Sequence, residues 1–121
     1  MTIENILVVD DSPTDRHILL EILTKSGYKV VTAASGEEVI AMTKEIMPDL
    51  ILMDVVMPGQ DGFYATRTIA KSADTKHIPI IICSTKGQET DKIWGMRQGA
   101  VGYIVKPIVV AELLQKITEL G

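Results

Sequence analysis

The chain has 121 residues, of which 46% are hydrophobic, and a formal net charge of −4 at pH 7. This length and composition fit one domain with a proper hydrophobic core. The sequence has no apolar run long enough for a membrane span, no signal-peptide pattern and no basic cluster for nucleic acid. We therefore expect a single cytoplasmic domain over residues 1–121, with no output domain.

Five short apolar runs rich in valine and isoleucine predict β-strands. They span residues 6–9, 29–33, 50–53, 80–83 and 102–105. The third run contains no polar residue, which is typical of a strand covered on both faces of a sheet. The fourth run includes the only cysteine, Cys83, which we interpret as a small core residue and not as a reactive thiol.

The first of five intervening helices has the clearest start. Ser12 can cap it, Pro13 suits its first position, and Asp15 favours the positive end of the helix dipole. Beyond that effect, we interpret Asp15 as a surface charge. The predicted apolar stripe consists of Ile18, Leu19, Ile22 and Leu23, and Gly27 ends the helix.

Two further helices follow the second and third runs. Ser35 and Glu38 predict a capping box, after which Val39, Met42 and Ile46 should face the core. Pro48 prevents this helix from continuing. The third helix is expected over residues 63–71, where the apolar stripe is weak.

The fourth helix is expected over residues 88–98 and contains Gly95, which costs roughly 1 kcal/mol relative to alanine. Its Trp94 and Met96 fit either the core or a partner surface. The fifth helix begins near Val109 and has the cleanest amphipathic pattern. Its apolar stripe consists of Val110, Leu113, Leu114, Ile117 and Leu120.

Strand and helix alternate five times along the chain. This order predicts an α/β, flavodoxin-like, doubly wound fold: a parallel five-stranded sheet in the order 2-1-3-4-5 with helices on both faces. The carboxyl ends of all five strands then open on one edge, where such folds bind their ligands.

Polar residues with a common chemistry follow the strands at that edge. They are Asp10, Asp11, Asp54, Ser84, Thr85 and Lys106. Three carboxylates close together raise each other's pKa unless a cation lies between them, and an all-oxygen set suits Mg²⁺. A lysine and a hydroxyl complete a set for phosphoryl transfer, in which a carboxylate attacks phosphorus and the cations neutralise the phosphoryl oxygens.

In these residues the sequence resembles the response-regulator receiver domains of two-component signalling, over about residues 5–120. The motifs that carry the resemblance are Val9-Asp10-Asp11-Ser12, Leu52-Met53-Asp54-Val55-Val56-Met57-Pro58-Gly59, Ser84-Thr85 and Val105-Lys106-Pro107. Each motif alone is weak, but all four in order at strand ends are highly specific.

The resemblance implies a role for each site residue. Asp54 is the implied phosphoacceptor, and Asp10, Asp11, Asp54 and the backbone carbonyl of Val56 are the implied Mg²⁺ ligands. Lys106 is the implied lysine that stabilises the phosphoryl group. Ser84 is the implied hydroxyl that senses this group, and Tyr103 is the implied switch aromatic that swings inward. A cis peptide bond between Lys106 and Pro107 is also implied.

The stretch over residues 85–95 is similar to stand-alone receivers of the chemotaxis type, especially those of twitching motility through type IV pili. The family resemblance implies a histidine kinase as phosphodonor and a signal passed by protein contact through the fourth helix, fifth strand and fifth helix, and the narrower likeness implies pilus-driven movement as the output. The domain would catalyse only its own phosphorylation and dephosphorylation. We expect a monomer, with dimerisation on phosphorylation left open.

Several alternatives remain at this point. A Mg²⁺-dependent phosphohydrolase would want a second acid where Val56 stands, and a flavin carrier would want a phosphate loop where Asp10 and Asp11 stand. A binding module that works unphosphorylated, or a sink that drains phosphate from a shared kinase, fits the same residues. Ser84 also fits an ordinary strand-end hydroxyl, and Tyr103 a half-buried core aromatic.

The residue two places after the phosphoacceptor bears on the lifetime of the phosphoryl group. Receivers that lose phosphate quickly tend to carry a polar side chain there, which positions water. The corresponding residue is Val56, which cannot orient a nucleophilic water, and we therefore predict slow self-hydrolysis.

Overall fold

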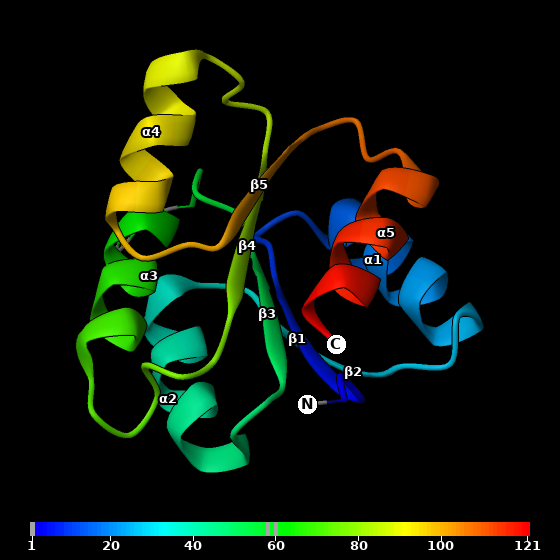
Figure 1. Ribbon diagram of the computed structural model, residues 1–121, viewed down its shortest axis with the longest axis horizontal. Coiled ribbons are helices and arrows are strands. Elements are labelled where there is room, and N and C mark those ends of the chain that lie inside the picture. The colour runs from blue at the N-terminus through cyan, green and yellow to red at the C-terminus, as the bar shows by residue number, and fades with distance from the viewer. Residues whose placement is uncertain (1, 58, 60) are drawn as a thin grey trace.

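The computed structural model describes residues 2–57, 59 and 61–121 (Figure 1). Its strands are β1 (Asn5–Val9), β2 (Lys29–Ala33), β3 (Leu50–Met53), β4 (Ile80–Ser84) and β5 (Gly102–Val105). Its helices are α1 (Pro13–Lys25), α2 (Gly36–Ile46), α3 (Gly62–Lys71), α4 (Glu89–Arg97) and α5 (Val110–Leu120). All the elements predicted from the sequence are therefore present with closely similar ends. Pro58, which the motif after Asp54 includes, lies outside the described residues.

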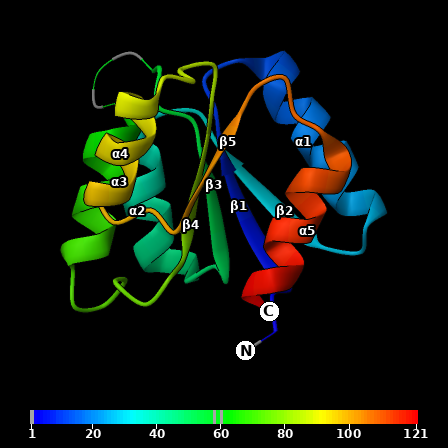
Figure 2. The same ribbon diagram turned by 45° about the horizontal axis from the view of Figure 1, so that its top comes forward.

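The sheet is parallel throughout, in the order β2-β1-β3-β4-β5, which confirms the predicted doubly wound fold. Helices α1 and α5 cover one face, and α2, α3 and α4 cover the other (Figures 1 and 2). In register, Val9 pairs with both Ala33 and Met53, so β1, β2 and β3 end at the same level. This alignment brings the residues that follow β1 and β3 side by side.

The hydrophobic core has two main layers, because successive side chains of a strand point to opposite faces. Ile6 and Val8 pack with the buried residues of α1 and α5, whereas Leu7 and Val9 pack with those of α2 and α3. Cys83 lies in the first layer, and burial raises the pKa of its thiol to about 12. Its interpretation as a small core residue is confirmed. No helix within the described residues has both the length and the apolar character that crossing a membrane requires.

Side-chain caps begin helices α1, α2 and α3. Ser12 Oγ accepts the amide of Asp15 at 3.3 Å, and Ser35 Oγ accepts that of Glu38 at 3.1 Å. A full capping box at α2 also requires the side chain of Glu38 to accept the amide of Ser35. This half of the prediction is wrong, because Glu38 Oε1 accepts the amide of Ala34 instead. No cap was predicted for α3, but Asp61 Oδ1 accepts the amide of Tyr64 at 2.8 Å and caps this helix.

Three residues predicted to face the core are instead exposed at the edges of their helices. Ile18, Ile46 and Val110 have exposed fractions of 46%, 41% and 45%. Each helix contacts the sheet along a strip narrower than its apolar stripe, so the flanking residues reach solvent. Trp94 and Met96, left open above, are about half exposed and therefore belong to the surface.

Candidate functional site

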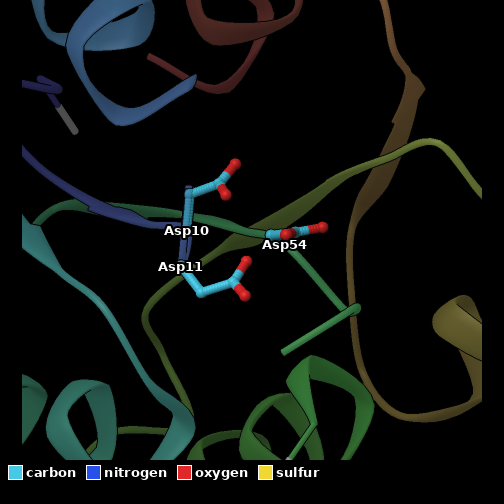
Figure 3. Close-up of side chains that lie close together, drawn as sticks. All are labelled: Asp10, Asp11 and Asp54. Carbon is cyan, nitrogen blue, oxygen red and sulfur yellow. The ribbon is translucent and has the colours of Figure 1, made fainter. Parts of the chain in front are cut away.

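Three carboxylates meet at the carboxyl edge of the sheet. Asp10 and Asp11 follow β1, Asp54 follows β3, and one carboxylate oxygen from each lies within 4.8 Å of the other two (Figure 3). The ends of the two strands are tied together, because the amide of Asp54 donates to the carbonyl of Val9 at 2.9 Å. Asp10 and Asp54 are buried, whereas Asp11 is exposed, so the cluster opens to solvent on the side of Asp11.

Asp54 is a buried carboxylate whose charge Lys106 compensates only in part. Only 6% of the residue is exposed, and its Oδ1 accepts the amides of Val55 at 2.9 Å and Val56 at 3.4 Å. Burial, together with the charge of Asp10, raises the pKa of Asp54 from 3.8 to about 6 despite these hydrogen bonds. A cation bound between the carboxylates would relieve this repulsion.

The donor set fits Mg²⁺. The cluster contains only oxygen ligands, and two of its carboxylates are buried where their mutual repulsion is not screened by water. The backbone of Val56 lies beside the same carboxylate, since its amide contacts Asp54 Oδ1, while its side chain is 50% exposed. Asp10, Asp11 and Asp54 are thus the residues that could hold the ion.

Lys106, which follows β5, supplies the positive charge of the site. Its Nζ donates to Asp10 Oδ2 at 2.6 Å and to Asp15 Oδ2 at 3.0 Å, and 11% of its side chain is exposed. Burial lowers the pKa of Lys106, but the hydrogen bonds to Asp10 and Asp15, together with the charges of Asp54 and Asp10, outweigh burial, and the pKa lies above its ordinary value. The ammonium is therefore charged at neutral pH. The peptide bond to Pro107 is cis, as the resemblance implies.

Ser84 and Tyr103 are linked through one residue of the β4–α4 loop. The amide of Lys86 donates to Ser84 Oγ at 3.1 Å, and the hydroxyl of Tyr103 donates to the carbonyl of Lys86 at 2.6 Å. Ser84 is fully buried and Tyr103 is half-buried. A movement of Ser84 toward the carboxylates would therefore disturb the loop to which Tyr103 is hydrogen bonded.

Gly95 has a packing role that explains its place inside a helix. A Cβ at this position would lie 2.8 Å from Ile82 Cδ1 and 3.2 Å from the ring of Tyr103. The absence of a Cβ lets α4 pack closely against these two side chains, which offsets the low helix propensity of glycine. Tyr103 consequently packs directly against the backbone of α4.

Reasoning from the sequence missed three residues around the site. Asp15 is not a simple surface charge, because it shares the ammonium of Lys106. Arg16 Nη1 donates to the carbonyl of Asp10 at 2.7 Å, and Gly62 packs so tightly that a Cβ would overlap the carbonyl oxygen of Asp54. Asp15 and Arg16 lie in the first turn of a helix that begins at the ligand edge, and this position is the signal that could have revealed them.

Comparison with known proteins agrees with this geometry. Residues 6–118 match the response regulator receiver domain family. The chain is 50% identical over 112 residues to protein PilH of Pseudomonas aeruginosa, with 93% of each chain covered.

Solved structures are also similar over nearly the whole chain. Chemotaxis protein CheY4 of Vibrio cholerae has a TM-score of 0.91 and 32% identity, and the match covers 99% of this chain and 100% of that one. The receiver domain of a sensor histidine kinase from Pseudomonas aeruginosa PAO1, with magnesium coordinated in its active-site cleft, has a TM-score of 0.90 and 28% identity; the match covers 98% of each chain. The chain therefore belongs to the response regulator receiver domain family, the phosphoacceptor domains of two-component signalling.

Proposed function

We propose that this receiver domain accepts a phosphoryl group on Asp54 from the phosphohistidine of a histidine kinase, with Mg²⁺ bound by Asp10, Asp11, Asp54 and the carbonyl of Val56. The observation that carries the proposal is the cluster of three carboxylates within 4.8 Å, with the ammonium of Lys106 bonded to one of them. Bound there, Mg²⁺ would neutralise charge on the phosphoryl oxygens.

The chain's own residues account for the remainder of the transfer. A carboxylate oxygen of Asp54 attacks phosphorus as the bond between phosphorus and the imidazole nitrogen breaks, and the electron pair of that bond stays on the imidazole, which takes up a proton. The amides of Val55 and Val56 hold the carboxylate in position. Lys106 lies at the end of β5, where its charge stabilises the added phosphoryl oxygens.

The signal is then passed on by a change of surface. Ser84 hydrogen bonds a phosphoryl oxygen and releases the amide of Lys86, and the loop and Tyr103 move with it. The face formed by α4, β5 and α5, with Trp94 and Met96 exposed, takes up the downstream protein. The loop and Tyr103 thus have two arrangements, and the charge of the phosphoryl group favours one of them.

The pathway is proposed from likeness. The 50% identity to protein PilH and the resemblance over residues 85–95 support a cytoplasmic regulator of twitching motility that works by protein contact. A phosphate sink for a shared kinase is the second candidate, since it uses the same acceptor chemistry. The domain is proposed to act as a monomer, with phosphorylation-dependent dimers tested by size-exclusion chromatography.

Incubation with acetyl phosphate and Mg²⁺ should add one phosphoryl group to the wild type and none to Asp54→Ala, as measured by intact mass. Chelation of Mg²⁺ should abolish the addition, because the buried carboxylates then repel the anionic donor. A folded wild-type protein that gains no mass in the presence of Mg²⁺ would favour a binding module that works unphosphorylated.

The phosphoryl group on the wild type should persist for minutes or longer without a phosphatase, because the exposed side chain of Val56 cannot orient water. Val56→Asn supplies a polar group and should shorten the half-life by about tenfold or more, since a positioned side chain contributes typically 10²- to 10⁴-fold. Loss of phosphate is followed by intact mass after removal of the donor. Val101→Asn, at another exposed valine, is the matched control, and a wild-type half-life of seconds would refute the prediction.

A further inference from the structure

The ammonium of Lys106 is shared by two carboxylates that come from different elements. Asp10 lies at the end of β1 and is buried, whereas Asp15 lies in the first turn of α1 and its side chain is 42% exposed. The contact with Asp15 is 3.0 Å between Nζ and Oδ2. Nothing in the proposed transfer uses Asp15, yet it hydrogen bonds the ammonium that the transfer needs.

The two partners of Lys106 differ in what happens when the site is loaded. Asp10 is a proposed metal ligand, so bound Mg²⁺ compensates its charge and frees the ammonium from it. Asp15 is not part of the cluster of three carboxylates, and its charge still competes for Lys106 after the ion has bound. The phosphoryl group therefore competes with Asp15 for the position of the ammonium.

The charge of Asp15 lies close to the carboxylate cluster, because Lys106 Nζ donates to both Asp15 and Asp10. Asp15, Thr85 and Lys106 also line a hollow of about 430 Å³, whose other lining residues are the apolar Ile18, Leu19, Pro107 and Ile108. An anionic donor that approaches Asp54 is repelled by the negative charge of Asp15 and also loses part of the attraction of Lys106. Both effects act in the same direction.

We propose that Asp15 is a positioning residue that holds Lys106 toward α1 and thereby slows phosphorylation of Asp54. The inference rests on the proposed function. Asp15→Asn should raise the rate of phosphorylation by acetyl phosphate and Mg²⁺ about two- to fivefold, the range expected for a partly exposed ion pair. Asp15→Glu restores the charge and should keep the wild-type rate.

Two further measurements separate this role from a structural one. The advantage of Asp15→Asn should shrink in high salt, because salt screens an exposed charge. In the metal-free protein, the ¹³Cε signal of Lys106 should shift in Asp15→Asn. Glu21→Gln, which removes the same charge from α1 at an exposed position, should change neither the rate nor this signal.

The outcomes are distinguishable. Equal rates for wild type and Asp15→Asn, or a slower variant, would overturn the inference and leave the proposed function standing. An advantage that is independent of salt, or an unmoved Lys106 signal, would also overturn it. A wild type that is not phosphorylated at all would overturn the proposed function, and the inference with it.

Discussion

Replacement of Lys106 by methionine should slow phosphorylation of the protein by acetyl phosphate and Mg²⁺ about 10- to 100-fold. A hydrogen bond to a charged group is worth about 1.5–3 kcal/mol, which corresponds to this range of rates when the bond forms only in the transition state. Methionine keeps the length and apolar stem of the side chain, so the packing beneath the site is retained. The rate is measured by intact mass at a series of times.

The matched control is Lys76→Met, which removes the same charge at an exposed position between α3 and β4. It should phosphorylate at the wild-type rate. A Lys106→Met protein that is folded and phosphorylates as fast as the control would show that the ammonium does not stabilise the transferring group.

Replacement of Asp54 by asparagine should stabilise the metal-free fold by about 2–3 kcal/mol at pH 7 to 8. Burial and the charge of Asp10 raise the pKa of Asp54 to about 6, so the folded state binds a proton more readily than the unfolded state does. The ionised carboxylate therefore destabilises the fold above this pKa. Asparagine removes the charge and keeps an oxygen for the amide of Val55.

The sign of this effect sets its pH dependence. The wild type has no penalty below the unfolded pKa of 3.8, and it loses stability as pH rises from there through about 6. The advantage of Asp54→Asn in urea unfolding should therefore be absent near pH 4 and complete by pH 7. Added Mg²⁺ should stabilise the wild type more than the variant.

Asp49 offers a control, because its replacement by asparagine should have the opposite effect on the stability of the fold. Its carboxylate accepts the amides of Asn5 and Glu4 at 3.0 Å each, and these bonds lower its pKa. Asp49→Asn should therefore destabilise the fold at neutral pH, and the loss should fade as the pH falls toward 3. An Asp54→Asn protein less stable than the wild type at pH 8 would contradict the account of charge repulsion at the site.

Most of the fold follows from local pattern. Apolar runs without polar alternation, separated by capped helical patterns, predict buried parallel strands. The alternation of strand and helix along the chain then predicts a doubly wound sheet. The exposed Ile18, Ile46 and Val110 show what the sequence pattern does not predict. The width of the strip that a helix buries depends on the shape of the sheet beneath it. That shape is a tertiary property and leaves no mark on the helix sequence.

The site likewise contains residues whose positions follow from the sequence and contacts that depend on the tertiary structure. The positions of Asp10, Asp11, Asp54, Ser84 and Lys106 follow from strand ends on a common edge, and the resemblance implies a role for each. The ion pair of Asp15 with Lys106 joins residues far apart in the chain and depends on side-chain reach. The close approach of Gly62 to Asp54 likewise depends on the path of a loop, which sequence spacing does not specify.

The central claim is that Asp54 carries the phosphoryl group, and the most direct test is to locate it. The wild-type protein is labelled with acetyl phosphate and Mg²⁺ and then treated with borohydride, which reduces an acyl phosphate to the alcohol and so converts aspartate to homoserine. Peptide mass spectrometry should find homoserine at position 54 and aspartate at positions 10 and 11. Homoserine at Asp10 or Asp11, or at no position in the folded, Mg²⁺-loaded protein, would contradict the account.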